Sequence, residues 1–369
     1  MRATFSKKAN VCSMATKGRT VARTTLRQVA EAVGLHVSTV SRILNRPECA
    51  KASDETRERV LAVAGDLDYQ ANAVARALVK GRVGSIGVLV PDYLDPVYMQ
   101  YVEELARLFE AEGSLLAPMV THFGAEAEQR ALTVLNSGRV DAVIALRYEP
   151  ENGVFYRHIS ERGLPLVFRL PEDVGRIPFD AVVLDISEGF GVLADHFAKS
   201  GRRRIGLLGG FAATELAHGQ SASLSVRRFL ASCRAHGLNA GPESAVPCRP
   251  QAKAAHDALL GRFGVGGVPP YDAIVVQSNR LLPGVCSGLR QLGVRVPEDV
   301  ELGVISDSEF CRAADIPIVV WAQPVSRICA ELFRLTRDRL SVCSRPPCRV
   351  RVQSRLIFRE TGDHRNGQQ

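Results

Sequence analysis

The spacing of apolar and polar positions divides the chain into a short helical head and a longer body. In the head, apolar residues recur at helical spacing over 26–33 and again over 37–45. Thr25 and Gln28 stand three residues apart at the start of the first segment, which predicts a capping box. Gly34 follows the segment and can adopt the left-handed conformation that ends a helix. The pattern predicts two helices joined by a tight turn.

The second predicted helix has an apolar and a polar side. Its expected buried stripe consists of Val37, Val40, Ile43 and Leu44. Its outward side is expected to present Ser38, Thr39, Ser41, Arg42 and Asn45. Small polar side chains with one arginine suit close approach to a DNA major groove, where arginine can bind guanine O6 and N7. A third helix is predicted over 53–67.

From Ser85 the pattern changes to short apolar runs alternating with amphipathic segments. Strands are predicted over 86–90, 115–120, 142–146, 166–170, 181–184, 204–208, 273–276 and 302–305. Helices are predicted over 97–112, 126–137, 155–162, 188–200, 223–236, 252–263 and 283–292. Continuous apolar strands separated by helices indicate parallel sheets covered on both faces. The alternation runs through two cycles, which predicts an all-α head followed by two doubly wound α/β lobes.

Charge is distributed unevenly along the 369 residues, whose formal net charge is +8. Residues 1–82 hold 15 Lys and Arg against 7 Asp and Glu, whereas the remaining residues hold 32 of each kind. All of the excess positive charge therefore belongs to the head and the segment after it. A basic head on a neutral body suits binding to nucleic-acid phosphates.

Several other classes of protein and site are disfavoured. The nine cysteines are scattered without a Cys-x-x-Cys pair, which favours reduced thiols, and no histidine spacing predicts a metal site. No apolar run reaches the ~20 residues of a membrane span. Residues 1–23 are basic and lack the apolar block of a secretory signal, so we expect a disordered arm and a cytoplasmic protein. Translation starts at Met1 or at Met14.

The order of several motifs resembles the lactose-repressor (LacI/GalR) family of bacterial transcriptional regulators. The motifs stand at 25–30, 37–45, 56–60, 72–78 and 86–92, and the resemblance extends to about Thr361. It implies a regulator, most often a repressor, that binds a palindromic operator as a homodimer under the control of a small-molecule effector. It also implies a periplasmic-binding-protein-like core whose two lobes enclose that effector.

The resemblance further implies a division of the chain into segments. These are a basic arm (1–23), a helix-turn-helix domain (24–70), a hinge helix with linker (71–83), a first lobe (84–184 with 307–345), a second lobe (185–306 with 346–361) and a polar tail (362–369). The tail has no leucine heptads, so a dimer is expected rather than a tetramer.

The resemblance assigns DNA contacts residue by residue. Base reading in the major groove falls to Val37, Ser38 and Arg42, while contacts to the DNA backbone fall to Thr39, Ser41, Asn45 and Asn72. In the hinge helix, Leu78 would wedge between base pairs of the minor groove with Ala75 packed beside it. His36 replaces a serine that usually caps the recognition helix. This predicts a weaker cap unless Ser38 serves, and His36 itself is either a phosphate contact or simply exposed.

Effector contacts are expected beyond the carboxyl ends of the strands. The candidates are Asp95, Tyr98, Arg147, Ser225, Asn279, Arg280 and Asp307, together with Phe168 and Arg169. Two of these positions depart from the family. Ser225 stands near a usual arginine, and Arg280 stands where the family has aspartate. A guanidinium in place of a carboxylate favours an anionic effector, such as a sugar acid or phosphorylated metabolite, or else the effector response has been lost.

Two functions from other classes compete with this interpretation. A solute-binding protein for transport would share the two lobes, but the head and the missing signal peptide disfavour it. An enzyme with a nucleotide cofactor is disfavoured because 207–210 and 264–267 are glycine-rich without the Gly-x-Gly-x-x-Gly spacing. No nucleophile–base pair stands out either, so neither catalysis nor a cofactor is expected.

Overall fold

The structure, a computed structural model, describes residues 24–45, 52–69, 82–171, 174–184, 186–209, 224–264, 269–342 and 344–360. The chain separates into two compact units, residues 1–81 and 82–369. The predictions for the basic arm, for Asn72, Ala75 and Leu78, and for the tail lie outside the described residues.

The first unit contains the three predicted helices. They are α1 (Leu26–Val33), α2 (Val37–Asn45) and α3 (Asp54–Asp66). The capping box is confirmed, since the Thr25 side chain accepts from the Gln28 amide at 3.3 Å and the Gln28 side chain accepts from the Thr25 amide at 2.7 Å. Gly34 is also confirmed as the left-handed end of α1, with φ 72°. The turn between α1 and α2 therefore follows from local signals alone.

A small apolar core holds the three helices together. Its buried members are Val29, Ala30, Val40, Ile43, Val60 and Ala64. Val37 does not belong to it, because its side chain is 37% exposed. The prediction of Val37 in the buried stripe of α2 is wrong, since this first helical residue lies beyond the reach of α1 and α3. Val37 instead remains on the outward side of the helix.

The second unit contains two six-stranded sheets. The first lobe comprises β1 (Ser85–Val90), α5 (Pro96–Glu110), β2 (Leu115–Val120), α6 (Ala125–Leu135), β3 (Ala142–Ala145), α7 (Gly153–Glu161), β4 (Leu166–Pro171) and β5 (Asp180–Leu184), together with α14 (Val325–Ser341) and β11 (Arg349–Arg351). The second lobe comprises α8 (Ile186–Lys199), β6 (Ile205–Gly209), α10 (Leu224–Ala235), β7 (Ala245–Pro247), α11 (Ala252–Phe263), β8 (Ala273–Val276), α12 (Leu282–Gln291), β9 (Glu301–Ile305), α13 (Glu309–Arg312), β10 (Ile318–Ala322) and β12 (Arg355–Arg359).

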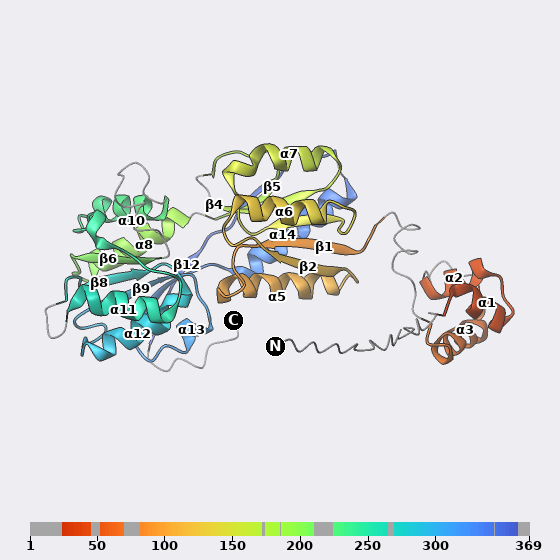
Figure 1. Cartoon of the computed structure of the whole chain (residues 1–369), viewed down its shortest axis with the longest axis horizontal. Helices are drawn as coiled ribbons and strands as arrows, with labels where there is room; N and C mark the ends of the chain where they lie inside the picture. The colour runs from red at the N-terminus through yellow and green to blue at the C-terminus, as the bar shows by residue number, and fades with distance from the viewer. Residues whose placement is uncertain are drawn as a thin grey trace, which may run out of the picture. The chain divides into compact units, whose positions relative to one another are not determined.

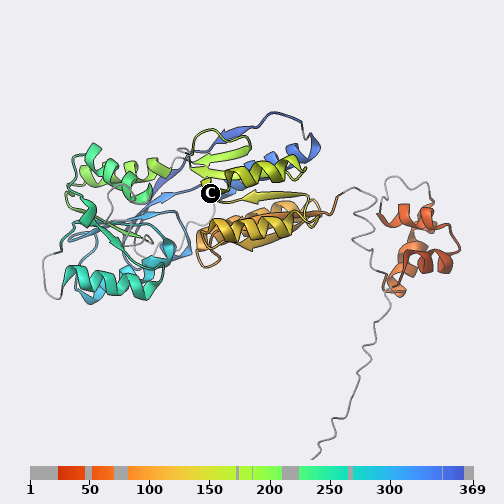
Figure 2. The same cartoon turned by 45° about the horizontal axis from the view of Figure 1, so that its top comes forward.

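Each sheet is covered on both faces, which confirms the predicted fold class (Figures 1 and 2). In the first lobe, α5 and α14 pack on one face and α6 and α7 on the other. In the second lobe, α8 and α10 cover one face and α11 and α12 the other. Strand order is β11-β5-β4-β3-β1-β2 in the first sheet and β12-β10-β9-β8-β6-β7 in the second, and all pairings are parallel except β10 with β12. Apolar residues on both faces of the inner strands account for this burial, whereas the edge strands β2, β11 and β12 are partly exposed.

The chain passes between the lobes at points that differ from the expected boundaries. We expected 307–345 to belong to the first lobe, but β10 pairs with β9 in the second sheet, so the return occurs between β10 and α14. We expected 346–361 in the second lobe, but β11 pairs with β5 in the first sheet. Sequence pattern does not show which of the two sheets a short strand joins, because that choice depends on tertiary packing.

Candidate nucleic-acid interface and effector site

The outward side of α2 carries the predicted base-reading residues. Ser38 and Arg42 are exposed together with Val37. The Arg42 Nε donates to the carbonyl oxygen of Ser38 at 3.2 Å, one helical turn earlier. This bond directs the guanidinium toward the start of α2 and leaves both terminal nitrogens outward. Two parallel N–H donors fit guanine O6 and N7.

The predicted DNA-backbone residues of α2 lie beside this surface. Thr39 and Ser41 are half-buried, and Asn45 is the last residue of the helix. His36 precedes the helix, and its Nδ1 accepts from the Ser38 amide at 3.3 Å. The imidazole therefore serves as the cap of α2, so the predicted weakening of this cap is offset by His36 itself.

Two carboxylates at the end of β1 contact the second lobe. Asp92 forms an ion pair with Arg280 at 2.5 Å, and each of these side chains is 16% exposed. Asp95 caps α5 by accepting from the Val97 amide, and it accepts from the Ser278 hydroxyl at 3.0 Å. Burial raises the pKa of Asp95. The Asp92 carboxylate therefore balances the charge of Arg280 at this junction of the two lobes.

A second set of contacts between the lobes meets at Gln323, which follows β10. Its side-chain oxygen accepts from the Tyr101 hydroxyl at 2.8 Å and from Arg169 Nη2 at 2.6 Å. Its side-chain nitrogen donates to the Ser306 hydroxyl. Arg169 lies over the Tyr101 ring at 5.5 Å and is only 6% exposed. Burial raises the pKa of Tyr101 to about 12, so Tyr101 remains a neutral donor.

Arg169 is a buried cation whose hydrogen-bond partners among the described residues, Gln323 and the Leu146 carbonyl, are neutral. Besides Gln323 it reaches the Leu146 carbonyl oxygen at 3.5 Å, and its Nε has no partner among the described residues. Arg169 is one of the effector candidates expected from the sequence, which gave it no specified partner. The available signal was a single arginine within the apolar run 166–170, where a charge is costly to bury.

Two predicted effector residues converge on an aromatic side chain that the sequence did not single out. The Tyr98 and Phe123 rings pack edge to face at 6.3 Å, and the Arg147 guanidinium lies 5.2 Å from the Phe123 ring centre. Phe123 is 45% exposed and has φ 56° in the turn after β2. Burial raises the pKa of Tyr98. An exposed ring with a phenol and a guanidinium beside it offers a surface for the apolar face of a ligand.

The remaining predicted effector residues are placed differently. Asn279 is fully buried, donates to the Ser306 carbonyl and accepts from the Ser308 hydroxyl at 2.6 Å. Asp307 is paired with Arg359 and Arg312. Both therefore brace loops of the second lobe. Ser225 lies half-buried in the first turn of α10.

Arg147 connects this surface to a buried polar cluster of the first lobe. It pairs with Glu149 at 2.5 Å. The Glu149 amide donates to the Tyr156 hydroxyl, which in turn donates to Glu128. Glu128 also accepts from Asn152 at 3.0 Å. Burial raises the pKa of Glu128, and the hydrogen bonds from Tyr156 and Asn152 offset this only in part.

The raised pKa of Glu128 predicts how the stability of the second unit changes with pH. Because the folded state holds the Glu128 proton more tightly than the unfolded state, this stabilisation is present at low pH and lost as pH rises through the raised pKa. Glu128→Gln should therefore unfold at a higher temperature than the wild type at pH 8, by about 2–4 °C for on the order of 1 kcal/mol. The gain should shrink toward pH 5. Glu126→Gln, an exposed change on the same helix, is the control, and a gain independent of pH would contradict the assignment.

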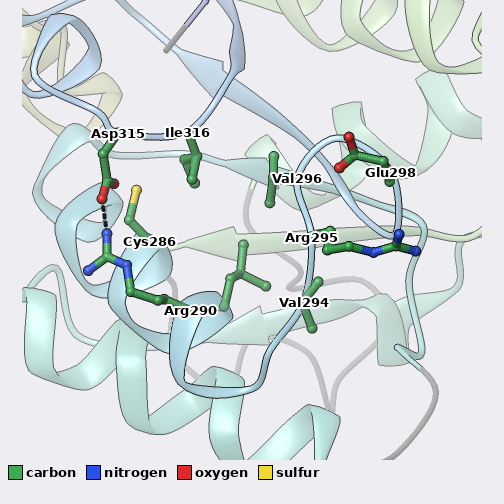
Figure 3. A pocket seen from close by; sticks show the side chains of 9 residues that line it. Cys286, Arg290, Val294, Arg295, Val296, Glu298, Asp315 and Ile316 are labelled. Atoms are coloured by element: carbon green, nitrogen blue, oxygen red, sulfur yellow. Dashed lines mark hydrogen bonds and ion pairs between the residues drawn. The ribbon is translucent and has the colours of Figure 1, made fainter. Parts of the chain in front are cut away.

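A pocket of about 480 Å³ lies elsewhere on the second lobe (Figure 3). It is lined by the end of α12 and by the loop before β9, which is the amino edge of that sheet. Ligands of doubly wound sheets bind at the carboxyl edge. Its arginines are already engaged, Arg290 with Asp315 and Arg295 with Asp299. This pocket therefore lacks the position expected of a ligand site in this fold.

Neither a metal site nor a membrane-spanning helix is found in the described parts of the chain. No group of three or more His, Cys, Asp or Glu side chains among those residues is placed to hold a metal ion. No helix of the described ranges is long and apolar enough to cross a bilayer.

Comparison with known proteins found family matches in both units of the chain. Residues 25–72 match the family of bacterial regulatory proteins, lacI family, and residues 194–361 match a periplasmic binding protein-like domain. The maltose regulon regulatory protein MalI of Escherichia coli (strain K12) is 28% identical over 341 residues, covering 87% of this chain and 92% of MalI.

Solved structures share the fold. A lac repressor dimer bound to operator and the anti-inducer ONPF superposes with a TM-score of 0.75 at 22% identity, covering 92% of this chain and 99% of that one. The Cra dual regulator of Pseudomonas putida in complex with fructose 1-phosphate has a TM-score of 0.59 at 20% identity, covering 75% of this chain and 98% of Cra. With a matching head, a matching core and relatives that align over most of their length, the chain belongs to the lacI family of bacterial regulatory proteins.

Proposed function

We propose that the protein is a sequence-specific, DNA-binding transcription regulator that binds a palindromic operator as a homodimer in the cytoplasm, acting as a repressor. The observation that carries this proposal is the outward side of α2, where Arg42 is held by the Ser38 carbonyl with its terminal nitrogens free to reach a guanine. The positive balance of residues 1–82 adds the attraction to phosphates that such binding requires. The relatives are named as regulators and not as enzymes.

Selection of DNA by the purified protein tests this proposal. Fragments of the source genome are incubated with the full chain at two salt concentrations, and bound fragments are sequenced. We expect a few fragments with an inverted repeat to be enriched, with affinity that falls steeply as salt rises. Binding that does not distinguish genomic fragments from random competitor at either salt concentration would refute it.

We further propose that an anionic metabolite, such as a sugar acid or phosphosugar, binds at the lobe junction and alters DNA affinity. Arg169 supports this class of ligand, because it is a buried guanidinium whose Nε has no partner among the described residues. The exposed Phe123 ring beside Tyr98 and Arg147 would contact the apolar face of a sugar. Cra, whose structure contains fructose 1-phosphate, is a relative in fold with a ligand of this class.

Replacing Arg169 by methionine should weaken this binding. A screen of sugar acids and phosphosugars by thermal shift identifies a ligand for the wild type, and calorimetry then compares the variants. We expect Arg169→Met to bind about 10- to 100-fold more weakly, since a charge-assisted hydrogen bond is lost. Arg162→Met, an exposed change in the same lobe, should bind as the wild type does. Equal affinities of the Arg169 variant and the wild type would contradict the role of Arg169.

An effector-independent regulator is the second candidate, and one observation favours it. The Asp92–Arg280 pair and the Asp95–Ser278 bond already link the two lobes through the protein's own side chains. A chain that supplies these links itself would hold its lobes together without a metabolite. The same screen separates the two candidates, because a regulator of this second kind would show no stabilising ligand and unchanged operator affinity.

A further inference from the structure

His36 makes two contacts to the same residue of the recognition helix. Its Nδ1 lies 3.3 Å from the Ser38 amide nitrogen and 2.8 Å from the Ser38 hydroxyl oxygen. A backbone N–H can only donate, so the nitrogen that it faces must accept. Nδ1 therefore carries no proton, and the imidazole is in the neutral form protonated at Nε2.

This tautomer decides the direction of the second contact. Since Nδ1 has no proton, the only hydrogen available between the two atoms is that of the Ser38 hydroxyl. Ser38 therefore donates to His36 and has no proton left for another partner. Its oxygen keeps its lone pairs, and the side chain is exposed on the outward side of α2. Ser38 thus presents a fixed hydrogen-bond acceptor.

Arg42, one helical turn further along α2, presents hydrogen-bond donors where Ser38 presents an acceptor. Arg42 Nε is occupied by the Ser38 carbonyl oxygen, which leaves the terminal nitrogens as donors one turn along the same side. The outward side of α2 therefore shows an acceptor and a pair of donors in fixed order. A free serine could not contribute to such an order, because its hydroxyl rotates to suit either kind of partner.

We propose that His36 sets the base preference of the recognition helix by holding Ser38 as an acceptor. In the major groove, adenine N6 and cytosine N4 are donors, whereas guanine O6 and N7 and thymine O4 are acceptors. Ser38 would then select adenine or cytosine on the strand that it faces and discriminate against guanine or thymine there. The inference rests on the proposed DNA-binding function. In it, His36 affects base recognition by orienting Ser38 and does not itself contact a base.

A capping role alone makes a different prediction. If His36 only stabilised the start of α2, its loss would weaken binding to all operator variants equally. If it orients Ser38, the ratio of affinities for amino-bearing and keto-bearing bases must change. Substitutions that keep a cap but differ in hydrogen-bond direction separate the two roles. Asparagine offers an oxygen that only accepts from Ser38, whereas a serine hydroxyl can donate or accept.

The experiment uses the full chain and the operator found by genomic selection. Each base pair of the half-site is varied in turn, and binding of the wild type, His36→Asn, His36→Ser, His36→Ala and Ser38→Ala is titrated. We expect one position at which the wild type and His36→Asn prefer an amino-bearing base about tenfold, while the other three variants differ by less than about twofold.

The outcomes are distinguishable from failure of the proposed function. If the wild type enriches no genomic sequence, the DNA-binding proposal itself fails. If the wild type binds an operator and His36→Ser keeps the same preference at every position, the role of His36 is overturned. Thermal unfolding of His36→Asn and His36→Ser is measured alongside, and we expect both variants to retain the folded head, so that a lost preference is distinguished from a lost helix.

Discussion

Arg42→Ala should abolish the preference of the protein for its operator while leaving binding to random DNA nearly intact. The Arg42 guanidinium, bonded through Nε to the Ser38 carbonyl, has two parallel terminal N–H donors that match guanine O6 and N7. Losing such a pair costs about 1–3 kcal/mol at each half-site, and a homodimer loses it twice. Operator affinity should therefore fall by about 30- to 20,000-fold.

Titration of labelled operator and labelled random duplex with each variant checks this expectation. Arg27→Ala is the matched control, because Arg27 lies on α1, pairs with Glu31 and carries the same charge. It should reduce affinity for both DNAs slightly and equally. Equal losses on both DNAs for Arg42→Ala would show that Arg42 contacts phosphates and does not read bases.

The head could be predicted in detail because its signals are local. Thr25 and Gln28 stand three residues apart, so the geometry of one helical turn is enough to join them. Gly34 ends α1 because a left-handed residue is needed there. Val37 shows the limit of such reasoning. Helical periodicity placed it on the buried stripe, but burial at the first residue of a helix depends on whether a neighbouring helix extends that far.

The lobe junction could be predicted only as a region. Parallel strands end at one edge, which drew attention to Asp95, Tyr98 and Arg147, and their role as effector contacts stays a prediction. The pairing of Asp92 with Arg280 could not be predicted, because the two residues are 188 positions apart and no local pattern connects them. For the same reason, the sequence did not reveal that Asn279 and Asp307 form bonds that brace loops of the second lobe, since a polar residue after a strand can contact a ligand or brace a neighbouring loop.

Asp180 illustrates a long-range network that the sequence did not reveal and that should dominate the stability of the first lobe. Its side chain is fully buried and accepts from Arg339 at 2.8 Å, from both terminal nitrogens of Arg345 at 2.8 and 2.9 Å, and from the Cys348 amide at 2.7 Å. These bonds fasten the chain that leaves α14 to the start of β5, so that β11 can pair with β5.

Asp180→Ala should destabilise the second unit by about 3–5 kcal/mol, because it leaves two guanidinium groups near the interior without their carboxylate. The melting temperature should fall on the order of 10 °C. Asp180→Asn should cost nearly as much, since its NH₂ group would face donors. Asp315→Ala, which removes an exposed partner of Arg290, is the matched control and should change the melting temperature little.

Hydrogen exchange and a compensating variant distinguish a buried charge from a merely loosened strand. Amides of β11 should exchange faster in Asp180→Ala than in the control, because Asp180 fixes the segment that precedes them. Replacing Asp180, Arg339 and Arg345 together by apolar residues of similar size should recover part of the lost stability, since no unpaired charge remains. If the triple variant is as unstable as Asp180→Ala, the loss comes from packing around Asp180 and the electrostatic explanation is wrong.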